Sequence, residues 1–181
     1  DRGFMGGESF EYPMVDVSHG GMWGKSGEEA FDEYMLGKMN YCVFSNWELG
    51  LLERKGVLDK LKSYRVTGRP DMDILHRLEK ERVPNDRPVV LYAPTWNWDL
   101  NGGYKQIMDT IKFLGKLKGK YGFSLEVAIH PLIEHGLPFQ DILEVADDVR
   151  GVEQEFMPFL SRADILVGDM SSNMLQFSVT G

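Results

Sequence analysis

The sequence has a single cysteine, Cys42, and no long apolar run. A single cysteine excludes a framework of disulfide bonds and is consistent with a reducing compartment. Its place in the apolar run "YCVF" predicts that Cys42 is a buried strand residue. No stretch approaches the roughly 20 apolar residues of a membrane-spanning helix, and no secretory signal is visible. The first residue is Asp1 rather than Met, so these absences apply only to the segment given.

Basic residues are outnumbered by acidic ones. Lys and Arg number 20 against 28 Asp and Glu, which gives a formal net charge of −8. A protein that binds duplex nucleic acid normally carries a basic stripe, and none is visible, so no nucleic-acid partner is expected. Because no spacing of His, Cys, Asp and Glu is typical of a metal site, the sequence predicts no metal.

Apolar residues make up 43% of the 181 residues, enough for the core of one domain or of two small ones. Short apolar runs alternate with amphipathic stretches, which predicts an α/β fold with a parallel, doubly wound sheet. The expected strands lie at 12–20, 41–45, 64–68, 89–93, 124–130, 149–153 and 165–169. The expected helices lie at 26–39, 47–56, 71–81, 103–122, 142–148 and 155–164, with a last one from Ser171.

Two serines mark helix starts and one proline-containing segment divides the chain. Ser26 and Ser45 are each followed three residues later by a glutamate, the spacing of a capping box, and Gly56 supplies a stop for the second helix. The polar segment "RVPNDRP" holds two prolines. We therefore expect one lobe over 1–82, a linker over 83–88 and a second lobe over 89–181.

Four polar segments follow expected strands: "SHGG", "APTWNWD", "IHP" and "GDMSS". Ligands of open parallel sheets bind beyond the carboxyl ends of the strands, so these segments are the expected site. Two of the four histidines, His19 and His130, lie in them. Each has a plainer reading, as a turn residue or the end of a strand.

The same segments resemble a known family. "VSHGG", "VTGRPDMDIL", "VVLYAPTW", "IHPL" and "ADILVGDMSSNMLQFSVTG" stand in the order found in CDP-glycerol glycerophosphotransferases, the teichoic-acid polymerases and primases. The resemblance runs from about Val15 to Gly181. It implies a GT-B fold, with two Rossmann-like lobes facing a cleft, both incomplete in this chain.

The resemblance also implies an activity of the EC 2.7.8 type. A glycerol phosphate or similar polyol phosphate would pass from a CDP-activated donor, the substrate rather than a cofactor, to an acceptor hydroxyl of a cell-surface polymer or a lipid-linked molecule. It further implies a cytoplasmic location, at the membrane's cytoplasmic face if a docking region lies outside this chain. The alternatives are another GT-B enzyme that uses a sugar nucleotide, such as a glycosyltransferase or a UDP-sugar 2-epimerase relative, and a non-catalytic nucleotide-binding domain.

The chemistry assigns roles to the residues. His19, in the glycine loop with Gly20, is suited to accept the proton of the attacking hydroxyl, because an unperturbed imidazole has a pKa of about 6.5. His130 is suited to donate to a phosphate oxygen as CMP departs. The remaining expected binding residues are Thr95 and Trp96 at the nucleotide, Asp169, and Ser171 and Ser172 at a helix start that offers free N–H groups to the diphosphate. Helix capping alone would also explain the two serines, and packing alone would explain Trp96. Asp169 has a structural reading too, in which it orients the loop or caps the helix.

The chain departs from the family pattern where the family usually has cations. Asp71 follows the proline of the G-x-P segment, where an arginine is common, and Asn97 follows Trp96, where another is frequent. Ala128 replaces a lysine two residues before His130, and the first loop lacks its usual proline. These departures weaken the prediction of CDP-glycerol in particular more than that of a nucleotide diphosphate in general.

Overall fold

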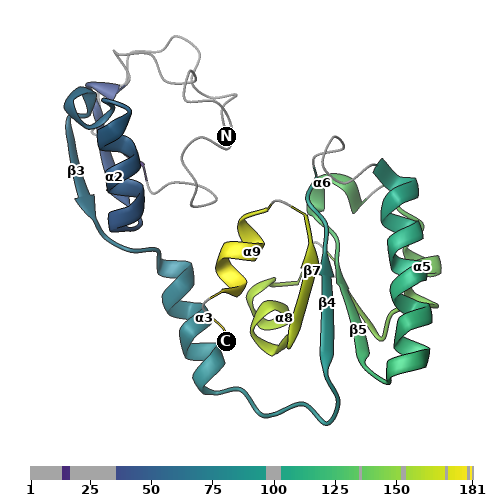
Figure 1. Ribbon diagram of the computed structural model, residues 1–181. Coiled ribbons are helices and arrows are strands. Elements are labelled where there is room, and N and C mark those ends of the chain that lie inside the picture. Colours follow the sequence, from purple (N-terminus) through teal and green to yellow (C-terminus); the bar gives the residue numbers. More distant parts are fainter. Residues whose placement is uncertain are drawn as a thin grey trace. The chain divides into compact units, whose positions relative to one another are not determined.

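The structure, a computed structural model, divides by its internal contacts into two compact units, Asp1–Pro70 and Asp71–Gly181 (Figure 1). It describes residues 14–16, 36–96, 103–134, 136–151, 154–169, 171–178 and 180. The expected helix over 26–39 lies mostly outside the described residues, as does most of the expected strand over 12–20.

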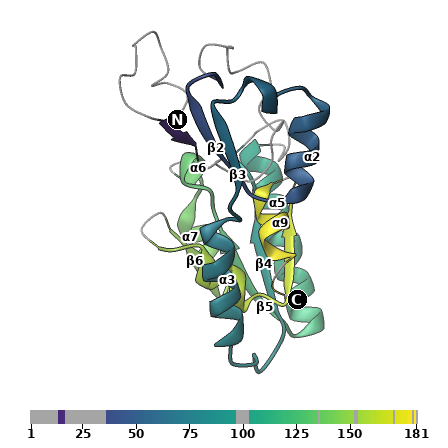
Figure 2. The same ribbon diagram turned by 90° about the vertical axis from the view of Figure 1, so that its left-hand side faces the viewer.

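The first unit contains a parallel sheet in the order β1-β2-β3 (Figure 2). Its strands are β1 (Met14–Asp16), β2 (Met39–Val43) and β3 (Ser63–Val66). Helix α2 (Asn46–Arg54) buries Leu52 against β2, and the 3-10 turn η3 (Leu58–Lys60) leads to β3. Cys42 lies in β2 as expected, although it is only half-buried.

Both predicted ends of α2 are confirmed. The Glu48 N–H donates to the Ser45 hydroxyl oxygen at 3.2 Å, which makes Ser45 the N-cap. Gly56 follows the helix with φ of +63°, a left-handed conformation that glycine adopts without a steric penalty. Its N–H donates to the Glu53 carbonyl and the Val57 N–H to the Leu52 carbonyl, the bond pair that closes a Schellman motif.

The second unit contains a four-stranded parallel sheet in the order β6-β5-β4-β7. Counted from β4 along the chain, this is the order 3-2-1-4 of half a Rossmann fold, so the predicted doubly wound arrangement is confirmed. Its strands are β4 (Val89–Ala93), β5 (Ser124–Ala128), β6 (Asp148–Arg150) and β7 (Ile165–Gly168). Its helices are α3 (Pro70–Lys80), α5 (Gly103–Tyr121), α6 (Pro131–Glu134), α7 (Phe139–Leu143), α8 (Met157–Arg162) and α9 (Ser172–Phe177).

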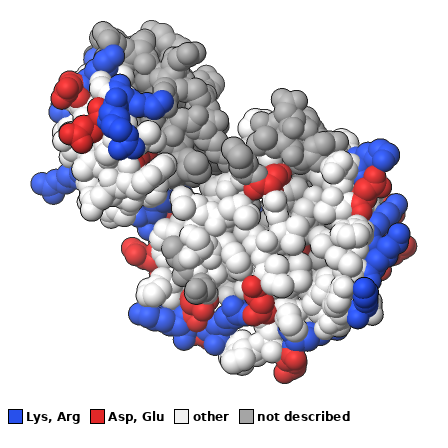
Figure 3. Space-filling model, viewed as in Figure 1, with Lys and Arg blue, Asp and Glu red and all other residues white. Residues whose placement is uncertain are grey.

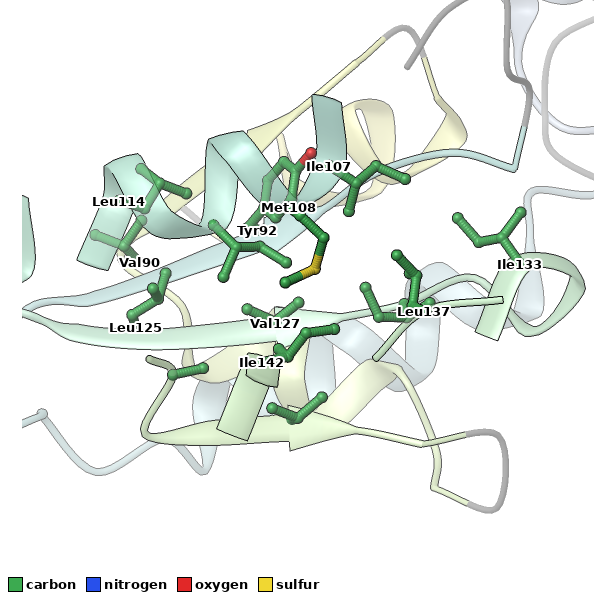
Figure 4. Packing of buried hydrophobic residues seen from close by; sticks show 14 residues of the cluster. Val90, Tyr92, Ile107, Met108, Leu114, Leu125, Val127, Ile133, Leu137 and Ile142 are labelled. Carbon is green, nitrogen blue, oxygen red and sulfur yellow. The ribbon is translucent and has the colours of Figure 1, made fainter. Parts of the chain in front are cut away.

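Both faces of this sheet are covered, which is why all five residues of β4 are buried. Val90 and Tyr92 point into a core shared with α5, α6 and α7 (Figure 4), and Leu91 and Ala93 into a second core with α3 and α8. Gly115 lets α5 pack closely against Val145, because a Cβ at position 115 would lie only 2.3 Å from a methyl carbon of Val145.

The division between the units lies earlier than the sequence predicts, between Pro70 and Asp71 rather than at 83–88. Helix α3 belongs to the second unit because Leu75, which has no exposed surface, packs with Leu91. The segment after α3 is bound to the same unit: Asn85 donates to Asp164 at 2.9 Å, and Arg82 forms an ion pair with that carboxylate. A polar segment with two prolines therefore need not be a free linker.

Charged side chains gather at the edge where the strands of the second sheet begin (Figure 3, lower margin). Asp147, just before β6, accepts from the Leu125 N–H at 2.9 Å and pairs with Lys118 at 3.0 Å. Asp164, just before β7, accepts from the Val89 N–H at 2.7 Å. Both aspartates thus fix the start of a neighbouring strand.

Candidate functional site

The opposite edge of the second sheet has the geometry of a ligand site. From β4 the chain proceeds through β5 to β6 on one side, then returns through α8 to β7 on the other side. Strands β4 and β7 are neighbours at this reversal, in register from Val90 with Ile165 to Ala93 with Gly168. In open α/β sheets, ligands bind beyond the carboxyl ends of the strands at such a switch point.

The segments that follow β4 and β7 are tied together at the switch point. The backbone N–H of Thr95 donates to Asp169 Oδ2 at 2.8 Å. Thr95 is buried, with 6% of its surface exposed, whereas the next side chain, Trp96, is 50% exposed. Asp169 therefore holds the start of the loop that presents an exposed aromatic ring.

The turn from β7 into α9 contains two polar oxygens for which the described residues supply no hydrogen-bond partner. Ser171 is the N-cap of α9, with φ of −123° and ψ of 163°, but its hydroxyl makes no capping bond. Two atoms of the turn, Ser171 Oγ and Asp169 Oδ1, are buried. Neither atom makes a hydrogen bond with any of the described residues. A buried polar atom without a partner costs about 1–3 kcal/mol, so both atoms suit a ligand that supplies the missing bond.

Ser172 is the first residue of α9 and is half-buried. The helix has only six residues, so its dipole contributes less at this point than that of a long helix would. An anion at this turn would therefore be bound mainly by the hydroxyls and backbone N–H groups.

His130 stands at the same edge, beyond β5, which is the other neighbour of β4. The Leu132 N–H donates to His130 Nδ1 at 3.2 Å, and the Ile133 N–H donates to the His130 carbonyl at 3.0 Å. Ile133 is buried in the core, so this turn is fixed. A neutral imidazole that accepts at Nδ1 carries its proton on Nε2, which makes Nε2 the hydrogen-bond donor of this ring.

The negative charge of Asp169 also affects Tyr92, a residue of β4. Burial raises the pKa of Tyr92 above its ordinary value of 10.0, a bond with the Thr110 side chain opposes this, and the negative charge of Asp169 raises it further. The phenol of Tyr92 consequently stays protonated below the site at neutral pH.

Residues 58–181 match the family described as CDP-glycerol:poly(glycerophosphate) glycerophosphotransferase. This match covers most of the chain and all of the second unit. The chain belongs to this family. No curated protein sequence matches the chain.

Two solved structures of the wall teichoic acid polymerase TagF are similar to this member of the glycerophosphotransferase family. One, a histidine-to-asparagine variant soaked with CDPG, has a TM-score of 0.57 at 18% identity over 82% of this chain. The other, a histidine-to-alanine variant, has a TM-score of 0.52 at 17% identity over 80%. They confirm the expected GT-B-like α/β fold. The chain spans only 39% and 38% of the TagF chains, so it corresponds to part of such a protein.

The structure places six of the eight predicted site residues of this family member at the carboxyl edge of the second sheet: Thr95, Trp96, His130, Asp169, Ser171 and Ser172. Of these, Thr95 and Asp169 are joined by a hydrogen bond. His19 and Gly20 lie outside the described residues, and their roles stay predictions. Within the described part of the chain, no three His, Cys, Asp or Glu side chains are grouped to hold a metal ion. Nor is any helix there long and apolar enough to cross a membrane.

One part-buried polar pair of the family member was not singled out by the sequence. Gln176 of α9 is 7% exposed, and its Nε2 donates to Asp71 Oδ2 at 2.7 Å. The one available signal is that Gln176 lies in the apolar stretch "NMLQF". Asp71, which stands where the family commonly has an arginine, is thus engaged within the fold.

Proposed function

We propose that the protein is a transferase of cell-surface polymer synthesis, which moves a glycerol phosphate or similar polyol phosphate from a CDP-activated donor to an acceptor hydroxyl. One observation carries the proposal: the segment that matches the glycerophosphotransferase family contains, at the switch point, two buried oxygens without a partner among the described residues. The activity is of the EC 2.7.8 type. The acceptor is a growing polymer or a lipid-linked molecule.

In the proposed reaction the acceptor oxygen attacks the phosphorus that carries the glycerol. A bond forms between that oxygen and phosphorus, and the bond to the bridging oxygen of CMP breaks. His19 accepts the proton of the hydroxyl, and general-base help of this kind is typically worth about 10²–10⁴-fold. The Nε2–H of His130 donates to a phosphate oxygen and stabilises the charge that develops as CMP leaves.

The two unpartnered oxygens have complementary tasks in this proposal. The Ser171 hydroxyl donates to a phosphate oxygen, and Ser172 adds a second hydroxyl beside it. Asp169 Oδ1 can only accept, so its partner is a hydroxyl of the donor rather than its phosphate, since like charges repel. Thr95, held by the other oxygen of Asp169, places Trp96 where its ring can stack on the base.

The proposed location is the cytoplasm, where the nucleotide-activated donor is available. The acceptor is processed at the cytoplasmic face of the membrane, which the protein contacts peripherally through regions outside this chain.

Calorimetric titration tests the donor. We expect heat of binding with CDP-glycerol and none with UDP-N-acetylglucosamine at the same concentration. His130→Gln should retain donor binding but lower transfer to acceptor about 10²–10³-fold, the usual effect of removing one donor to developing charge. Binding of the UDP-sugar alone would favour a sugar-nucleotide enzyme instead, and transfer unchanged by His19→Ala would exclude the catalytic assignment.

A further inference from the structure

Helix α9 is too short to fix its own orientation. It has six residues, and an isolated helix of that length is not stable in water, so contacts with the rest of the second unit must hold it. Its N-cap is Ser171, whose hydroxyl lies at the switch point. Whatever orients α9 therefore also places this hydroxyl.

On the sheet side, α9 leans on the end of β7. A Cβ built on Gly168 would lie 3.8 Å from Met174 Sδ and 3.1 Å from the Ala93 carbonyl oxygen. The side chain of Met174 is flexible and apolar, so this contact limits the distance of α9 from the sheet without fixing its rotation.

On the other side, α9 is held by α3 (Figure 1). Phe177 packs at the rim of the core that contains Leu75 of α3. Gln176 is 7% exposed and donates its Nε2–H to Asp71 Oδ2 at 2.7 Å, across 105 residues of sequence. This bond is directional and charge-assisted, so it fixes the rotation that the apolar contacts leave open.

We propose that Asp71 and Gln176 are a positioning pair, which sets the orientation of α9 and thereby the place of the Ser171 and Ser172 hydroxyls toward the donor phosphates. This inference rests on the proposed function. Neither residue touches the donor; both act through α9. Loss of the hydrogen bond lets the first residues of α9 rotate, while the sheet and its hydrophobic cores stay intact.

The test exchanges donor and acceptor between the two positions. Gln176→Glu places two carboxylates against each other, whereas the double variant Asp71→Asn with Gln176→Glu restores the bond in the opposite direction. Gln140→Glu, at an exposed position of α7, is the control for the added charge. The affinity for CDP-glycerol is measured by calorimetry and the exchange of the amide hydrogens over 171–178 by mass spectrometry.

We expect Gln176→Glu to weaken CDP-glycerol binding about tenfold and to speed the exchange of these amides, as for a lost charge-assisted bond. The double variant should return within about threefold of the wild type, because the two changes are coupled. Faster exchange with unchanged affinity would reduce the pair to a structural role, and unchanged exchange would overturn the inference outright. A wild-type protein that does not bind CDP-glycerol would instead overturn the proposed function.

Discussion

Two helices of this chain, α2 and α9, follow a parallel strand and begin at a serine, yet the two serines do different things. Ser45 and Ser171 both have the extended backbone of an N-cap. The Ser45 hydroxyl accepts the Glu48 N–H, whereas the Ser171 hydroxyl is buried without a partner among the described residues. Capping thus explains Ser45 and does not explain Ser171.

The carboxylates beside these serines differ in the same way. Glu48, fully buried, accepts from the Phe44 N–H at 2.7 Å and from the Tyr41 hydroxyl at 3.1 Å. Asp169 uses one oxygen for the Thr95 N–H and leaves the other buried and unpaired. Local rules are satisfied at one strand–helix turn and broken at the other, which favours the second turn as the candidate site.

The largest expected effect on stability is at the turn before α2, where the polar groups have hydrogen-bond partners. Glu48→Ala leaves the buried Tyr41 hydroxyl and Phe44 N–H unpaired and opens a cavity, so we expect the free energy of unfolding of the first unit to fall by about 3 kcal/mol. Urea unfolding followed by amide hydrogen exchange over 39–66 measures it. Glu53→Ala, at an exposed position of the same helix, should change it by less than about 0.5 kcal/mol. Equal effects of the two variants would contradict the account of this turn.

The two aspartates that flank β7 extend the comparison. Unlike Asp169, Asp164 is fully engaged, with the Val89 N–H, Asn85 and Arg82. Because 36% of its side chain is exposed, we expect Asp164→Asn to lower the free energy of unfolding of the second unit by only about 1–2 kcal/mol at pH 7.

The pH dependence of that loss follows from the pKa of Asp164. Burial raises this pKa, but the bonds from the Val89 N–H, Asn85 and Arg82 outweigh burial, and the pKa lies below its ordinary 3.8. A lowered pKa stabilises the fold at pH values above that ordinary value, and the stabilisation is lost as pH falls through the folded pKa. The difference between wild type and Asp164→Asn should therefore shrink below about pH 4 in thermal unfolding. A constant difference from pH 7 to pH 3 would show that charge is not involved.

Much of the fold could be predicted because its signals are local. Alternation of apolar runs with amphipathic helices gave the parallel sheets, and Ser45 and Gly56 marked the ends of α2. The boundary at Pro70 could not be predicted in this way, since it depends on Leu75 packing against Leu91, a contact between distant segments.

The site was predictable to the level of the strand ends but not of the atoms. The rule for parallel sheets placed Thr95, His130 and Asp169 at one edge. That Ser171 makes no capping bond depends on the position of a single hydroxyl, and that Gln176 reaches Asp71 depends on how α9 meets α3. Neither leaves a pattern in the sequence.

Ser45→Ala removes a capping bond that the structure contains. We expect the free energy of unfolding of the first unit to fall by about 1 kcal/mol, the usual cost of losing a serine N-cap. Affinity for CDP-glycerol should not change, because this turn, all of which the structure describes, has no buried side-chain oxygen without a hydrogen-bond partner. Both quantities are measured on the same preparation, by urea unfolding and by calorimetry.

Ser171→Ala is the change at α9 that matches Ser45→Ala at α2. Control variants aside, it has the smallest expected effect on stability, and any such effect is opposite in direction to that of Ser45→Ala. Since the Ser171 hydroxyl is buried without a partner, its removal should leave the free energy of unfolding of the second unit unchanged or raise it by up to about 1 kcal/mol. The same variant should weaken CDP-glycerol binding about tenfold, because one bond to a phosphate oxygen is lost. A loss of stability equal to that of Ser45→Ala, with unaltered affinity, would mean that Ser171 is an ordinary cap and that the two helix starts are alike.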